Sequence, residues 1–227
     1  GLLDKRLWSR VGFWEKGGAT MEYSLLGLLV LVFLVYLLFE ARRRVTHSQK
    51  VINEEKRAIA DASNMTASIG VFYPDKLTTI IIGASEEMGA LYYRMLNGNK
   101  VINRTKINLA NVVRVEMQIN SRPFAVESDS EKPTTSLRST DIANRKLDMF
   151  TPEALQGVQK ASMRIVYFSE DGMERSLEVT TLRAADSRNR AKRSQLLKNS
   201  IWWTAFINIS SRQARLLRNR MEDMGTA

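Results

Sequence analysis

The chain of 227 residues contains no cysteine, one histidine, only 4 prolines and 12 glycines. Without cysteine it has no disulfide framework, thiolate metal site or cysteine nucleophile. With His47 as its single imidazole, the usual zinc sites and histidine-dependent catalytic triads are disfavoured. The low glycine and proline content, beside 44% hydrophobic residues, excludes collagen-like and fully disordered chains. The composition predicts one folded domain with appendages.

Sequence motifs of catalysis are also missing: there is no GxxxxGK phosphate loop, GxGxxG, HExxH, GxSxG or CxxC. The adjacent acids Glu54-Glu55 and Glu86-Glu87 fall on a predicted stalk and turns, where carboxylates are usually solvated rather than poised as acid and base. We therefore expect no enzyme activity, no catalytic or metal-binding residue and no cofactor. His47 would ligate a pigment or haem only by reaching past Arg42–Arg44 into a bilayer.

One hydrophobic run dominates the N-terminal part. Residues 23–39 are 17 consecutive uncharged residues, rich in leucine, between Glu22 and Glu40. As a helix they extend roughly 25 Å, slightly less than a hydrocarbon core of about 30 Å. We predict a single transmembrane helix over residues 19–41, because a buried core helix normally keeps a polar face. The predicted span residues are Tyr23, Leu25, Leu28, Leu31, Phe33, Leu34, Tyr36, Leu38 and Phe39.

The residues on either side of this run predict how it lies in a membrane. Residues 1–18 carry apolar side chains at helical spacing among basic ones, which predicts an amphipathic interfacial helix joined to the span at Gly17-Gly18; a short helix packed on another subunit is an equal alternative. Six basic residues follow the span closely, against four before it. The positive-inside rule then predicts an external N-terminus and a cytoplasmic C-terminal domain, as in the bacterial inner membrane. The predicted interfacial residues are Trp8, Phe13, Trp14, Arg42, Arg43 and Arg44.

The excess positive charge lies after the span. Residues 1–40 hold four basic and four acidic groups, so the formal +10 belongs to residues 41–227. Such charge favours other subunits of a membrane complex or anionic lipids, the latter by about 1 kcal/mol per basic group near the surface. Nucleic acid is disfavoured because no nucleic-acid-binding motif accompanies the charge, and a solvated helix face explains any single residue. The predicted partner or lipid contacts are Arg188, Arg190, Lys192, Arg193, Lys198, Trp202 and Trp203.

The rest of the chain predicts an α+β domain. Residues 42–70 are polar with few breakers and predict a helical stalk. Residues 121–159 lose any periodic pattern and predict a mobile insertion with one short helix at residues 152–159. Residues 187–221 predict a last helix, and residues 222–227 a tail. The predicted strands are at residues 77–83, 91–96, 106–109 and 112–120, and in a hairpin at 163–179 around Asp171-Gly172.

This order of strands, insertion, hairpin and tryptophan-bearing helix resembles the bacterial pleckstrin-homology-like domains of membrane-associated proteins. The resemblance covers roughly residues 72–212 and predicts such a domain over residues 71–221. It implies a curved antiparallel sheet closed at one end by the helix, and binding of a peptide, protein or lipid headgroup rather than catalysis. Lys100, Arg104 and Lys106 are a hint of a phosphoinositide site. The segments that carry the resemblance are Ile80–Gly83, Asn97–Lys100, KINLANVVRVEMQI, MRIVYFSEDGMERSLEV and SIWWTAFINI.

A second segment is similar to another family. Gly18–Tyr23 and the apolar run look like the processing region of tight-adherence pilins, which implies an exported protein. Here Glu22 is the fourth residue after the glycine rather than the usual fifth, and Arg42–Arg44 oppose export.

Three functions are compatible with these patterns. The favoured one is a single-pass, membrane-anchored accessory or scaffold subunit whose basic cytoplasmic domain binds partner proteins of a larger membrane complex, such as a photosynthetic reaction centre or respiratory enzyme. The second is a free-standing adaptor that binds anionic lipid headgroups. The third is an exported minor-pilin-like protein.

Overall fold

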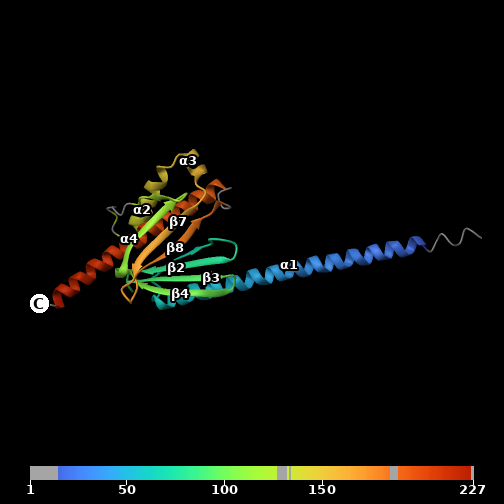
Figure 1. Ribbon diagram of the computed structural model, residues 1–227, viewed down its shortest axis with the longest axis horizontal. Helices are drawn as coiled ribbons and strands as arrows, with labels where there is room; N and C mark the ends of the chain where they lie inside the picture. The colour runs from blue at the N-terminus through green and yellow to red at the C-terminus, as the bar shows by residue number, and fades with distance from the viewer. Residues whose placement is uncertain (1–14, 127–131, 133, 185–188, 226–227) are drawn as a thin grey trace, which may run out of the picture. The chain divides into compact units, whose positions relative to one another are not determined.

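The computed structural model describes residues 15–126, 132, 134–184 and 189–225, with side chains described for residues 28–40 and from residue 48 onward within these ranges. The fold is α+β, with two antiparallel four-stranded sheets and a long C-terminal helix (Figure 1), which confirms the predicted class. The chain divides into two compact units, residues 1–49 and residues 50–227.

Helix α1 comprises Glu15–Ala62 and includes Gly17 and Gly18, where the sequence predicted a joint between two helices. In the unit of residues 1–49, every side chain from Leu28 to Phe39 is exposed, by 46% to 66%. Within the residues that the structure describes, no helix combines the length and apolar character that crossing a membrane requires. The predicted interfacial residues Trp8, Phe13 and Trp14 lie outside the described residues, as do the side chains of Tyr23, Leu25 and Arg42–Arg44.

Among the described residues from 50 onward, eight strands form two sheets. Sheet A has the order β1-β2-β3-β4 and sheet B the order β6-β5-β7-β8, so the single curved sheet implied by the resemblance is instead two hydrogen-bonded sheets. The strands of sheet A are β1 (Ser68–Phe72), β2 (Thr78–Ser85), β3 (Ala90–Asn97) and β4 (Lys100–Asn108). Those of sheet B are β5 (Val112–Ile119), β6 (Arg122–Phe124), β7 (Ala161–Phe168) and β8 (Glu174–Leu182).

Sheet A is covered on both faces. Its strand β2 contains three consecutive buried isoleucines, and since successive side chains of a strand point to opposite faces, both faces must be packed. Ile80 and Ile82 belong to the core shared with sheet B and helix α4 (Arg190–Gly225), whereas Ile81 packs with Ile52 and Ile59 of α1. The predicted stalk is therefore helical as far as Ala62, but its residues from 50 onward belong to the folded domain.

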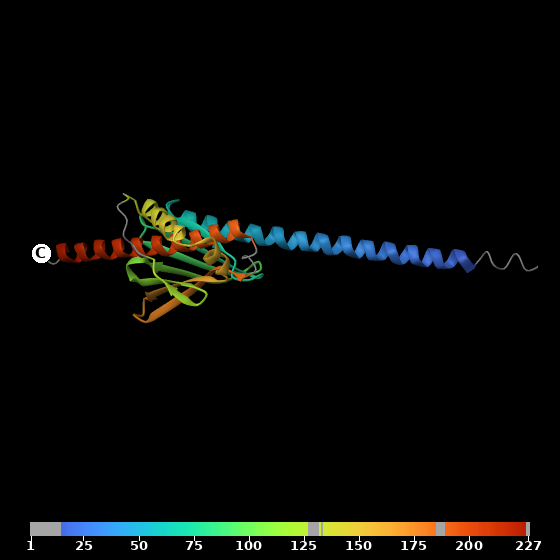
Figure 2. The ribbon, with the colours of Figure 1, turned by 90° about the horizontal axis from the view of Figure 1, so that it is seen from above.

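Helix α4 joins two cores. Trp203 and Phe206 lie in the core between the sheets, while Leu197 and Ile201 lie in a second core with helix α2 (Thr135–Asp148). Helix α2 runs beside α4 (Figure 2). Helix α4 continues through Glu222–Gly225, which the sequence assigned to a tail.

The segment predicted to be a mobile insertion contains regular structure. It holds β6, α2 and the short helix α3 (Pro152–Gly157), of which only α3 was predicted. Thr134 caps α2 by accepting a hydrogen bond from the Leu137 amide, and Ile142 and Ala143 are buried against α4. Helix α2 was not predicted because only a narrow face of it is apolar and the rest of its sequence is polar.

Candidate functional site

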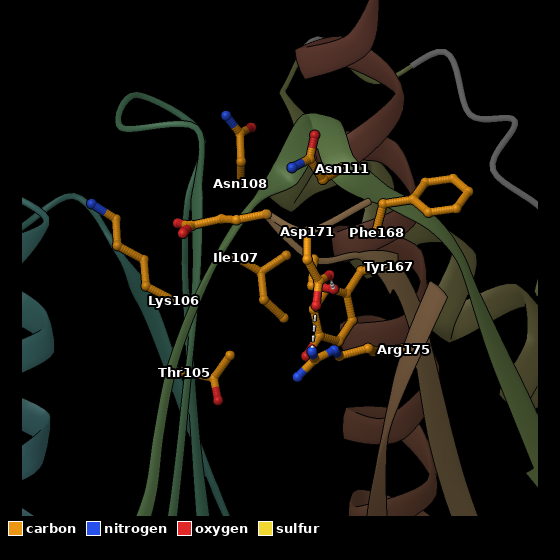
Figure 3. A pocket seen from close by; sticks show the side chains of 11 residues that line it. Thr105, Lys106, Ile107, Asn108, Asn111, Tyr167, Phe168, Asp171 and Arg175 are labelled. Atoms are coloured by element: carbon orange, nitrogen blue, oxygen red, sulfur yellow. Dashed lines mark hydrogen bonds and ion pairs between the residues drawn. The ribbon is translucent and has the colours of Figure 1, made fainter. Parts of the chain in front are cut away.

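A pocket of about 640 Å³ opens between the two sheets, where the end of β4 faces the β7–β8 turn (Figure 3). Residues 105–108 form one wall; Tyr167, Phe168, residues 169–171 and Arg175 form the other. Strands β4 and β8 are the last strands of sheets A and B. The pocket therefore adjoins sheet edges, where an added segment can reach both backbone and side chains.

One carboxylate organises the β7–β8 turn. Asp171 accepts hydrogen bonds from the Ser169 hydroxyl, from the Met173 amide at 3.1 Å and from Arg175 Nη2 at 2.7 Å. These hydrogen bonds, the one from Ser169 foremost, lower the pKa of Asp171 to about 2. Gly172 has a φ of +75°, a conformation that glycine adopts without steric cost. The predicted reversal at Asp171-Gly172 is confirmed.

The opposite rim is held by the 3₁₀ turn η1 (Leu109–Asn111) and by α4. Asn108 caps η1 by accepting a hydrogen bond from the Ala110 amide at 2.9 Å. Asn111, which lines the pocket, accepts a hydrogen bond from Arg218 Nη1 at 3.2 Å. The C-terminal helix thus fixes a polar group on the pocket rim.

The lining of the pocket combines opposite charges with apolar surface. Lys106 lies on the β4 wall, whereas Glu170, Asp171 and Arg175 lie on the hairpin wall, where Asp171 is paired with Arg175. Phe168 is 46% exposed at the same place. Across the described residues, no group of three or more His, Asp or Glu side chains is placed to hold a metal ion. The arrangement suits a polar, extended ligand carrying an apolar side chain.

An ionic cluster around a buried carboxylate ties α1 to sheet A. Arg94 and Arg104 are directly opposite each other on β3 and β4, and the Glu55 carboxylate lies between them. Glu55 Oε2 lies 3.3 Å from Arg94 Nε and accepts a hydrogen bond from Arg104 Nε at 3.2 Å. Glu55 is only 6% exposed, so the prediction of a solvated stalk carboxylate is wrong.

The pKa values of the two arginines of this cluster shift in opposite directions. Burial is the main influence on Arg94 and lowers its pKa, whereas the hydrogen bond to Glu55 raises the pKa of Arg104. Arg94 also donates hydrogen bonds to the carbonyls of Tyr93 and Thr105. The only sequence signal for this cluster is that Arg94 and Arg104 lie on either side of the β3–β4 turn. Whether they face each other depends on the register of the two strands, which the sequence does not display.

Some of the predicted partner contacts are buried in the structure and others are exposed. Trp203 is buried in the core, and Trp202 is partly buried, stacks on Phe206 and donates a hydrogen bond to Thr140 Oγ1 at 3.1 Å. Arg193 is also buried and donates to the Leu155 carbonyl at 2.8 Å, so Trp203 and Arg193 are not surface contacts. Arg190 and Lys192 are exposed and Lys198 is half-buried, whereas Arg188 lies outside the described residues.

No family model, curated protein or solved structure matches the chain significantly.

Proposed function

We propose that the chain is a membrane-anchored accessory or scaffold subunit whose C-terminal domain binds other proteins of a larger membrane assembly. The observation that carries the proposal is the continuity of α1. Twelve exposed apolar residues, Leu28–Phe39, and the domain-bound residues around Glu55 belong to one uninterrupted helix. We take residues 19–41 as its membrane span and, from the basic residues that follow, place the domain on the cytoplasmic side.

The exposed part of α1 supports anchoring because its apolar residues leave no polar side. Consecutive helical residues are separated by 100°, so twelve in a row surround the helix completely. A protein partner usually covers one face, whereas lipid covers all of them. Contiguous exposed apolar surface of this kind marks a membrane or protein contact.

The β4 edge supports binding of a protein segment. No strand within the described ranges pairs with its outer side, and a partner strand added there would run into the pocket. Strand β4 carries Lys100, Arg104 and Lys106 but no acidic residue. These basic side chains favour an acidic extended segment as the ligand. Lysines on an edge strand also discourage nonspecific pairing with other strands.

Anchoring is tested by placing a charge in the exposed apolar stretch. Val32→Arg should reduce the fraction of full-length chain that remains in membranes after carbonate washing, because arginine at the centre of a span costs about 3 kcal/mol. Asn53→Arg, at an exposed position of the same helix, should stay membrane-bound. Release of the unmodified chain by carbonate alone would contradict anchoring.

Partner binding is tested on detergent-solubilised membranes. The unmodified chain should migrate as a stoichiometric complex, and Phe168→Glu in the pocket should release it. Met173→Glu is the matched control, since Met173 is 63% exposed on the same hairpin but does not line the pocket. A chain that migrates alone and binds anionic vesicles in a salt-dependent way would support the lipid adaptor instead. Protease protection on sealed vesicles tests the orientation.

A further inference from the structure

An apolar stripe continues along the last turns of α4, beyond the residues that pack against the core. Ile207 and Ala214 pack against the core between the sheets. Leu217, Met221 and Met224 follow on the same side of the helix, because spacings of three and four residues return to one face. Their side chains are 59%, 64% and 73% exposed. We call these three residues the C-terminal stripe; their 4-3 spacing is that of a coiled-coil seam.

The flanks of the C-terminal stripe are basic. Arg218 and Arg220 lie on opposite sides of it, at the positions that contact a partner helix in a coiled coil. Residues 212–225 contain four arginines against Glu222 and Asp223, which leaves a net charge of +2. Arg218 also contacts Asn111 and lies 3.9 Å from Glu222. The surface thus presents an apolar seam between positive edges.

We infer that the C-terminal stripe docks an amphipathic helix of a partner protein that has apolar residues at 4-3 spacing and acidic residues on both flanks. A second copy of the chain fits poorly, because pairing two such helices brings arginine-rich flanks together. An anionic lipid surface fits less well, because Glu222 and Asp223 lie in the same turns as Met221 and Met224. The stripe shares no residue with the pocket lining, although Arg218 on its flank contacts Asn111 on the pocket rim, so variants of the stripe residues test it apart from the pocket.

Two synthetic peptides of three heptads provide the probes. Both have leucine at the seam positions; one has glutamate on the flanks and the other lysine. Binding is measured by fluorescence anisotropy on the full chain in nanodiscs of neutral lipid. The glutamate peptide should bind at least about tenfold more tightly than the lysine peptide. Equal binding of the two peptides would overturn the inference.

Variants of exposed residues locate the binding surface. The double variant Leu217→Ser and Met221→Ser should abolish binding, whereas Leu216→Ser should retain it, since Leu216 is 55% exposed but lies on another side of α4. Circular dichroism should be unchanged in both. Binding that survives the double variant would overturn the inference. Dimerisation of the chain, or binding of anionic vesicles, that the double variant removes would equally overturn it in favour of those occupants.

Discussion

Sheets A and B share a core but meet their surroundings differently. The outer face of sheet A is covered by α1, with Glu55 paired to two arginines beneath it. The outer face of sheet B carries a row of opposite charges, in which Arg164 lies across from Glu116 on one side and Glu178 on the other. All three of these sheet B residues are half-buried or exposed. The comparison shows that sheet A is the part of the domain to which α1 is attached, whereas sheet B meets solvent.

The largest effect should come from removing the buried carboxylate under α1. Glu55→Ala leaves Arg94, whose side chain is 13% exposed, without its counter-ion and opposite Arg104, and should lower the free energy of unfolding by about 3–5 kcal/mol. Denaturant unfolding of the full chain in detergent, followed by near-UV circular dichroism, measures this.

The neighbouring exposed acid provides the control. Glu54→Ala removes only the solvated ion pair with Lys50 and should change stability by less than about 1 kcal/mol. Similar small effects of both variants would show that α1 is not held by the ionic cluster.

A tight contact between α1 and sheet A should give the next largest effect. A methyl group at Gly83 would lie 2.4 Å from Cγ2 of the fully buried Ile59, so Gly83→Ala should destabilise the domain by about 1–3 kcal/mol. Ile59→Ala alone should cost about 2–5 kcal/mol. Because each change makes room for the other, the double variant should cost less than their sum; strict additivity would contradict the contact.

On sheet B the equivalent disturbance should be weaker. Arg164→Glu places three acidic residues side by side on the outer face and should cost about 0.5–1 kcal/mol, since these side chains remain in contact with water. Adding Glu178→Arg should restore part of the loss. A cost as large as that of Glu55→Ala would remove the distinction between the two sheets.

The smallest effect should be the pH dependence of the exposed turn of sheet B. The pKa of Asp171 falls from 3.8 to about 2 on folding, so its ionised form stabilises the turn above about pH 4 and loses this contribution as pH falls through 2. Asp171→Asn should therefore lower the Tm slightly at pH 6, and the difference should shrink towards pH 2. Thermal scans at several pH values measure it, and a constant difference would contradict the assignment.

Local patterns predicted the elements that contain them. The strands predicted at residues 77–83 and 112–120 are confirmed as β2 and β5, within one or two residues of their ends. The hairpin around Asp171-Gly172 was predicted for the same reason. These signals depend only on neighbouring residues, which the sequence displays directly.

The ionic cluster, the burial of Trp203 and the pocket could not be predicted, because they depend on contacts between residues distant in the sequence. Glu55 pairs with arginines 39 and 49 positions away, and its neighbour Glu54 is exposed, so no local signal distinguishes the two acids. Trp202 and Trp203 illustrate the same point, because only packing decides that Trp203 fills the core. The pocket is assembled from β4, η1, β7 and β8, and its existence follows from the arrangement of two sheets rather than from any motif.

Helix α4 follows both sheets in the order of synthesis, which has a consequence for the newborn chain. Both sheets are translated before the helix that supplies Trp203, Phe206, Leu197 and Ile201 to their cores. Until that helix leaves the ribosome, the core between the sheets lacks the side chains that complete it, and its exposed apolar residues are open to aggregation or chaperone capture. A chain truncated before Arg190 should accumulate in this exposed state, detectable by its association with chaperones.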